Sequence, residues 1–133
     1  MSQVSKERLA EEYGYLAQIA EELQKEITLT QSLVAEVDAA VLALKNINAL
    51  EDAKEILVPV SSGVYIRANL KKQEKFLVAI ARDIFVEKSF EEALDFLNKR
   101  KEELTQIIQR RIDDLNKIVS RIREIEGMIK AIK

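Results

Sequence analysis

The sequence predicts an α+β fold: a long antiparallel coiled-coil hairpin with two β-hairpins inserted between its helices. Three observations predict it. Apolar residues with heptad spacing run through both ends of the chain, and an apolar, β-branched stretch separates them. Charged residues make up 33% of the sequence and aromatic residues only 5%, a composition typical of long helices and coiled coils. We expect residues 1–133 to form a single domain.

A first helix is expected over about residues 5–50. Its apolar residues recur at alternating intervals of four and three through roughly five heptads, which is the spacing of a coiled-coil seam. At ~1.5 Å per residue such a helix is ~60 Å long or longer. The seam consists of Leu9, Tyr13, Leu16, Ala20, Leu23, Ile27, Thr30, Val34, Val37, Val41 and Leu44.

A second helix is expected over about residues 90–132. The stretch "SFEE" predicts a capping box at its start, with Ser89 as the N-cap and Glu92 reaching back to it. Lys101 and Arg111 are the only charged members of its seam. That seam consists of Leu97, Lys101, Leu104, Ile108, Arg111, Leu115, Ile118, Ile122, Ile125, Ile129 and Ile132.

The two seams match as an antiparallel pair. Facing residues in such a pair have numbers that add to a nearly constant value, and Leu44 with Leu97 adds to 141, as Leu16 with Ile125 does. Residues 1–50 carry 4 basic and 8 acidic side chains, whereas residues 89–133 carry 10 basic and 9 acidic ones. Flanking charges therefore attract across the pair, each contact contributing little. Both termini are expected together at one tip.

This pairing creates two polar layers within the seam. Thr30 is placed opposite Arg111, and Val41 opposite Lys101. A polar seam residue can fix the register of a coiled coil at some cost in stability. The alternative, which we favour, is that both long basic side chains run along the seam and extend their charges into water.

The middle of the chain, about residues 55–88, predicts four strands in two hairpins. "EILVPV" reads as a strand with Pro59 near its end, and "SSG" as a turn in which Gly63 takes a positive φ. "VYIRANL" alternates between apolar and polar positions. After the turn "KKQE", "KFLVAIA" reads as a strand buried on both faces, and "IFVEK" follows the turn "RD".

Two hairpins alone cannot bury their apolar faces or close their edges. A coiled coil that points away from them is expected to give them little cover. We therefore expect hairpins of several chains to join in an oligomeric β hub. Its predicted residues are Ile56, Val58, Val60, Val64, Ile66, Ala68, Phe76, Val78, Ile80, Ile84 and Val86.

Several function classes are not expected. The chain has no cysteine and no histidine, and it has no glycine-rich phosphate loop. We predict no catalytic residue, no cofactor and no metal site, and hence no enzyme. A net charge of −2 with a pI near 5.4 provides no basic field for nucleic acid. Without a continuous apolar run of ~18 residues, no membrane partner is expected, and we predict a cytoplasmic protein.

Three stretches together resemble the α-class subunit of prefoldin, of the archaeal type. They are "ILVPV" after the first helix, "SSG" followed by "VYIRANL", and "FVEKSFEEALDFLNKRKEEL" leading into the second helix. The α class is similar in having two hairpins, whereas the β class has one. The chain departs from the family's VPVGAGSF-type turn, having "VPVSSGVY", and it has "IARDIF" where the second turn often contains glycine. Because these changes fall in the hub, assembly with β-class subunits in an α2β4 hexamer and self-assembly of a divergent paralogue both stay open.

The resemblance implies an ATP-independent chaperone subunit. In the family, coiled-coil tips hold unfolded proteins, the clients, and deliver them to a group II chaperonin. Clients need adaptable apolar surface rather than a preformed pocket. The alternative is a prefoldin-like structural protein that assembles with itself into a filament. Closed pairing of subunits gives a ring, and open pairing gives a filament.

The tip, about residues 1–20 and 118–133, is the candidate client site. Four of its apolar side chains either close the last layers of the seam, which we favour for a static structure, or become available when the helix ends fray. These four are Leu9, Tyr13, Ile129 and Ile132. Gly14 and Gly127 face each other at one level, and glycine within a helix costs about 0.5–1 kcal/mol relative to alanine. The pair either loosens the tip or coincides by chance on exposed positions. The candidate residues are Val4, Leu9, Tyr13, Met128, Ile129 and Ile132.

Overall fold

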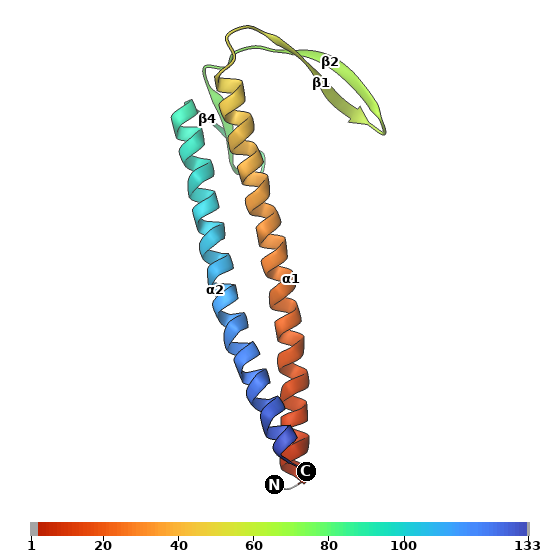
Figure 1. Cartoon of the computed structure of the whole chain (residues 1–133). Helices are drawn as coiled ribbons and strands as arrows, with labels where there is room; N and C mark the ends of the chain where they lie inside the picture. Colours follow the sequence, from red (N-terminus) through yellow and green to blue (C-terminus); the bar gives the residue numbers. More distant parts are fainter. Residues whose placement is uncertain (1–2, 133) are drawn as a thin grey trace. The chain divides into compact units, whose positions relative to one another are not determined.

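The computed structural model describes residues 3–132 and confirms the predicted fold class (Figure 1). Two long helices flank two antiparallel hairpins. The elements are α1 (Gln3–Asn48), β1 (Lys54–Ser61), β2 (Val64–Leu70), β3 (Phe76–Ala81), β4 (Ile84–Lys88) and α2 (Phe90–Ala131). The chain divides into two compact units. We call residues 1–35 with 102–133 the terminal unit, and residues 36–101 the central unit.

The predicted seams are buried in both units. Ile27 and Thr30 of α1 are 3% and 5% exposed, and Ile125 of α2 is fully buried. Every predicted seam residue of α2 is buried or half-buried, and so is every one of α1 except Tyr13. The alternation of fours and threes in the sequence therefore identifies the buried stripe of each helix.

The polar layer around Thr30 is confirmed. Arg111 donates a hydrogen bond from Nη1 to Thr30 Oγ1 at 2.9 Å, and the Thr30 hydroxyl donates to the carbonyl of Glu26 at 2.8 Å. Arg111 Nε also lies 3.3 Å from Glu26 Oε2. Arg111 does not simply extend its charge into water. Its guanidinium contacts Thr30 and Glu26 of α1 at the edge of the seam.

Lys101 contacts α1 at Asp38, and not at Val41, the residue predicted to lie opposite it. Within the central unit its Nζ lies 2.7 Å from Asp38 Oδ1. Asp38 comes three residues before Val41, so the ion pair lies almost one helical turn from the predicted partner. Long side chains reach flanking positions of the facing helix, and this contact uses such a position.

The N-terminus of α2 is the predicted capping box. The Ser89 amide donates to Glu92 Oε1 at 3.0 Å, and the Glu92 amide donates to Ser89 Oγ at 3.2 Å. Hydrogen bonds to the Glu92 carboxylate, from the Ser89 amide first and from the Ser89 hydroxyl second, lower the pKa of that carboxyl below its usual value, because they favour the ionised form. The reciprocal pair satisfies two amides at the point where the chain leaves β4.

Both hairpins are antiparallel and have an irregular register near the turn. β1 pairs with β2 and β3 with β4, and each pairing shifts its register two residues before the turn, between Pro59 and Ser61 and between Ala79 and Ala81. Gly63 takes a φ of 89°, as predicted, and Ser62 precedes it at 47°. Positive φ at both turn residues matches the twist of the flanking strands.

The core of the central unit joins β3 to both helices. Leu44 of α1, Val78 of β3 and Ala93 of α2 are its buried members, and Phe76 and Phe90 pack against them. The expectation that the helices give the hairpins little cover is therefore wrong for the second hairpin. Helix residues 36–47 and 93–97 extend far enough to cover one of its faces.

Burial of β3 on both faces is likewise not found in the single chain. Val78 is 7% exposed, whereas Leu77, whose side chain points to the opposite face, is 68% exposed. The helices form a layer on one side of the strand, and one chain supplies no second layer. "KFLVAIA" is apolar on both faces, but only one face is covered within the chain.

Candidate functional site

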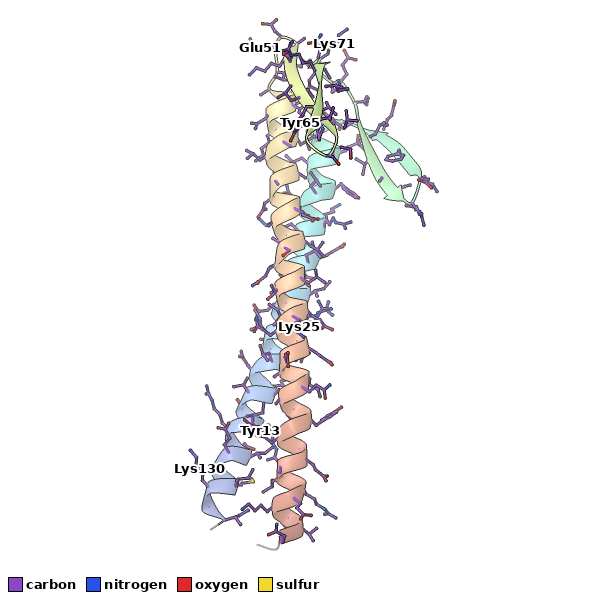
Figure 2. The ribbon with its side chains drawn as sticks, turned by 90° about the vertical axis from the view of Figure 1, so that its right-hand side faces the viewer. Tyr13, Lys25, Glu51, Tyr65, Lys71 and Lys130 are labelled. Carbon is purple, nitrogen blue, oxygen red and sulfur yellow. The ribbon has the colours of Figure 1, made fainter. Side chains whose placement is uncertain are left out.

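The tip residues divide into two groups. Leu9, Ile129 and Ile132 are half-buried and close the end of the seam, as the favoured interpretation predicts. The same interpretation is wrong for Tyr13, whose side chain is exposed. The other three are exposed. The exposed fractions are 58% for Val4, 37% for Tyr13 and 36% for Met128. Both figures show the first and last described turns at the same end of the terminal unit, with Tyr13 and Lys130 labelled in Figure 2.

A small hollow lies between the helix ends of the terminal unit. It has a volume of about 260 Å³, and it is lined by Leu9 and Met128 together with Ser5, Arg8 and Glu12. Its apolar part comes from both helices and its polar part from α1 alone. The hollow is large enough for a side chain rather than a small folded segment.

An ion-pair cluster joins the two helices beside this hollow. Arg121 Nε lies 2.8 Å from Glu12 Oε1, its Nη2 lies 3.1 Å from Glu12 Oε2, and its Nη1 lies 3.0 Å from Glu124 Oε2. We call Glu12, Arg121 and Glu124 the tip clasp. The hydrogen bonds to Arg121 lower the pKa of Glu12, and those to Glu12 and Glu124 raise the pKa of Arg121.

Sequence reasoning did not identify the tip clasp, although a signal for it was present. Glu12 and Arg121 each come directly before a seam residue, Tyr13 and Ile122. Such flanking positions are where coiled coils place interhelical ion pairs. The bidentate geometry defines how the two helices approach each other, while the solvent around it keeps the energetic contribution modest.

The two helical glycines occupy exposed positions. A Cβ added to Gly14 or Gly127 would meet no atom within 4 Å, and neither residue has a positive φ. Neither packing nor backbone conformation therefore requires glycine at these positions. This placement agrees with the interpretation that the two glycines face each other by chance at exposed positions. Fraying of the tip stays a prediction.

The predicted hub residues differ widely in burial. Val78 belongs to the core of its own chain, and Val58, Ala68, Phe76 and Val86 are half-buried. The exposed ones are Ile56, Val60, Val64, Ile66, Ile80 and Ile84.

The hairpins also expose apolar residues that the alternating pattern assigned to the opposite face. These residues are Leu57, Tyr65, Leu77 and Phe85, each 58% exposed or more. The alternating pattern predicted apolar side chains on one face of each strand, whereas the first hairpin exposes apolar side chains on both faces. The candidate assembly surface is therefore larger than predicted.

Residues 3–132 give little indication of a metal site or of a membrane span. This part of the chain contains no group of three or more acidic, cysteine or histidine side chains able to hold a metal ion. α1 is long and apolar enough to cross a membrane by length and composition, with a mean hydropathy of 1.5 in its most apolar window. Core helices of soluble proteins meet the same criterion, so this feature is weak evidence for a membrane span.

Comparison with known proteins identifies relatives over most of the chain. The family model described as prefoldin subunit matches residues 16–133. Prefoldin subunit alpha of Thermofilum pendens is 70% identical over 126 residues, which cover 95% of this chain and 98% of that protein. Prefoldin subunit alpha of Methanosarcina acetivorans is 31% identical, over 77% of this chain and 75% of its own length.

A solved structure has the same fold. A chain from the cryo-EM structure of filamentous PFD from Methanocaldococcus jannaschii superposes with a TM-score of 0.77 over 90% of this chain and 98% of its own. The two sequences are 22% identical. At that level the likeness concerns the arrangement of helices and hairpins.

Proposed function

Because the chain belongs to the prefoldin family, and within it to the α class, we propose that it captures unfolded proteins at its coiled-coil tip without using ATP. The family consists of chaperone subunits, so the general role follows from membership. The observation that carries the finer proposal is the exposure of Val4, Tyr13 and Met128 at the paired helix ends. Each apolar contact with a client is weak, and several together hold it.

The proposal includes the partners that the family resemblance implies. The subunit joins β-class prefoldin subunits in a hexamer through its hairpins, works in the cytoplasm and passes its clients to a group II chaperonin. The exposed apolar faces of the first hairpin support the assembly step, because a two-stranded sheet open on both faces is marginal in water. Catalysis, cofactor use, nucleic-acid binding and membrane insertion are not part of this function.

A self-assembling filament is the second candidate. One observation favours it: the solved structure with the same fold is described as filamentous. Light scattering on the purified chain, with and without a β-class subunit, separates the two. A fixed mass near a hexamer in the presence of that subunit supports the ring, and growth into large polymers with concentration supports the filament.

Suppression of aggregation tests capture at the tip. The assembled oligomer is mixed with a chemically denatured model protein, and turbidity is followed as the denaturant is diluted. The tip variant carries Val4→Ser and Met128→Ser. We expect about tenfold weaker suppression, because losing even a part of two apolar contacts removes roughly 1.4 kcal/mol of binding.

The matched control carries Leu29→Ser and Leu42→Ser. These side chains are 66% and 62% exposed on α1, at least as exposed as those at the tip. The control is expected to suppress aggregation as the unmodified chain does. An equal loss of aggregation suppression in both variants would show that any exposed apolar side chain can bind the client. It would contradict the proposal that the tip is the capture site.

A further inference from the structure

The hollow at the tip combines apolar and charged side chains in one small space. Its lining on α1 consists of four residues that share one face of the helix, since they follow the helical spacing of three and four: Ser5, Arg8, Leu9 and Glu12. Met128 of α2 completes the lining and is 36% exposed. Because a methionine side chain is flexible and polarisable, it adapts to apolar groups of different shape.

The two charges of this lining are not equally available. Glu12 accepts hydrogen bonds from Arg121 with both carboxylate oxygens, at 2.8 and 3.1 Å. The guanidinium of Arg8 is exposed and forms no hydrogen bond or ion pair with any residue from 3 to 132. Glu11, three residues further along the same helix, is exposed and does not contact it either. The negative charge of the hollow is therefore compensated within the chain, whereas its positive charge is open to a ligand.

The tip clasp explains why Arg8 is left without a partner. Arg8 and Glu12 are four residues apart on one helix, a spacing at which opposite charges commonly pair. Arg121 reaches the same carboxylate from α2 with a bidentate contact, which is stronger and more specific than a single ion pair along a helix. Because both oxygens of Glu12 are engaged, Arg8 keeps its donors for another acceptor. Arg121 thus acts as a positioning residue for the hollow.

We propose that the hollow binds client segments in which an apolar side chain stands next to an acidic one. The apolar side chain enters beside Leu9 and Met128, and the neighbouring carboxylate accepts hydrogen bonds from Arg8. The volume of about 260 Å³ suits one such side chain. The inference rests on the proposed capture of clients at the tip, and it specifies the class of segment that this subunit prefers.

The two contacts have different roles in binding. Burial of the apolar side chain supplies most of the affinity, and any apolar residue of suitable size provides it. The ion pair with Arg8 is exposed to water and therefore adds only a small preference. A basic neighbour would meet a like charge at Arg8. The acidic neighbour thus biases which segments are held, without excluding neutral ones.

The methyl group of Met128 provides a direct probe of the hollow, because the chain contains only two methionines, Met1 and Met128. The oligomer is assembled with this chain isotope-labelled at its methionine methyl groups, and Met128→Leu identifies the Met128 signal by its loss. Capped peptides of equal length carry Leu–Glu, Leu–Gln or Ser–Glu within an otherwise Gly–Ser sequence. Each peptide is titrated, and its Kd is taken from the shift of the Met128 signal.

The titrations have a defined expected outcome. The Leu–Glu peptide should bind about threefold more tightly than the Leu–Gln peptide, the effect of one exposed ion pair, and the Ser–Glu peptide about tenfold more weakly than Leu–Glu. Arg8→Gln should make Leu–Glu and Leu–Gln equal. The matched control, Arg123→Gln, removes an exposed arginine of the tip that does not line the hollow, and should leave the threefold difference intact. Arg121→Gln frees Glu12 to pair with Arg8, so the difference should shrink.

Three results would overturn the inference: equal Kd values for Leu–Glu and Leu–Gln, a difference that survives Arg8→Gln, and no Met128 shift at millimolar peptide. Tighter binding of a peptide that ends in leucine with a free carboxylate would overturn the assignment to an acidic side chain. Circular dichroism verifies that each variant is folded, and suppression of aggregation by the same oligomer is measured in parallel. Suppression without the peptide preference refutes only the preference, and the preference without suppression refutes only the chaperone function.

Discussion

Replacing both helical glycines tests whether a loosened tip is needed to capture clients. The double variant carries Gly14→Ala and Gly127→Ala. A Cβ at either position meets nothing within 4 Å, so the alanines fit without displacing a neighbour. Each substitution is expected to stabilise its helix by about 0.5–1 kcal/mol. The two together should lower the population of open tips about 5- to 30-fold, the factor that 1–2 kcal/mol represents.

Two measurements on this variant separate the physical effect from the functional one. Hydrogen exchange of backbone amides in residues 3–13 and 128–131 should slow by the same 5- to 30-fold. Suppression of aggregation should fall in parallel, because the half-buried seam residues of the tip become less available. A stiffened tip with unchanged suppression would refute the idea that fraying exposes the capture surface.

The matched control stabilises α1 outside the tip. Thr28→Ala and Ser32→Ala replace two exposed residues of modest helix propensity, and the Ser32 hydroxyl donates to the carbonyl of Thr28 at 3.2 Å. The control should raise the unfolding temperature without altering tip exchange or suppression. Unchanged tip exchange in the glycine variant would show that the two glycines do not set the stability of the helix ends.

Three other predictions concern the coiled coil and its cap. Ile125→Ala should lower the free energy of unfolding by about 2–5 kcal/mol in denaturant titrations, since Ile125 is fully buried; a loss below ~1 kcal/mol would contradict the seam. Ser89→Ala should cost about 0.5–2 kcal/mol. The lowered pKa of Glu92 stabilises the fold above its usual value near 4.5, and this contribution is lost as the pH falls through the lowered pKa. Glu92→Gln, which removes the titrating carboxyl, should flatten that part of the pH profile, and an unchanged profile would exclude the cap as its source. Arg121→Ala should speed amide exchange at the tip, and high salt should do the same in the unmodified chain. Equal exchange rates in the variant and the unmodified chain would show that the tip clasp does not stabilise the helix ends.

The sequence predicted the elements accurately because their signals are local and repeated. Alternating fours and threes identified the stripes around Ile27 and Ile125, and the spacing of Ser89 and Glu92 identified the cap. Gly63 located the first turn. Each of these features depends on residues that are near in sequence or on a periodicity sustained over many turns.

Features that depend on three-dimensional packing were not predictable in this way. The cover that Leu44 and Ala93 give to Val78 depends on how far the helices extend past the strand. The partner of Lys101 depends on which flanking position lies within reach of a long side chain. Leu77 is exposed because one chain supplies a covering layer on only one side of β3. The apolar pattern of a strand does not show how many layers cover it.

The central claim, capture at the tip, is tested most directly by mapping the bound client. Hydrogen exchange of the assembled oligomer is compared with and without an unfolded model protein in excess. We predict added protection in residues 3–20 and 118–132, around the exposed Val4, Tyr13 and Met128, with the central unit unchanged. Protection confined to residues 36–101, or no protection while the client stays bound, would contradict the proposal.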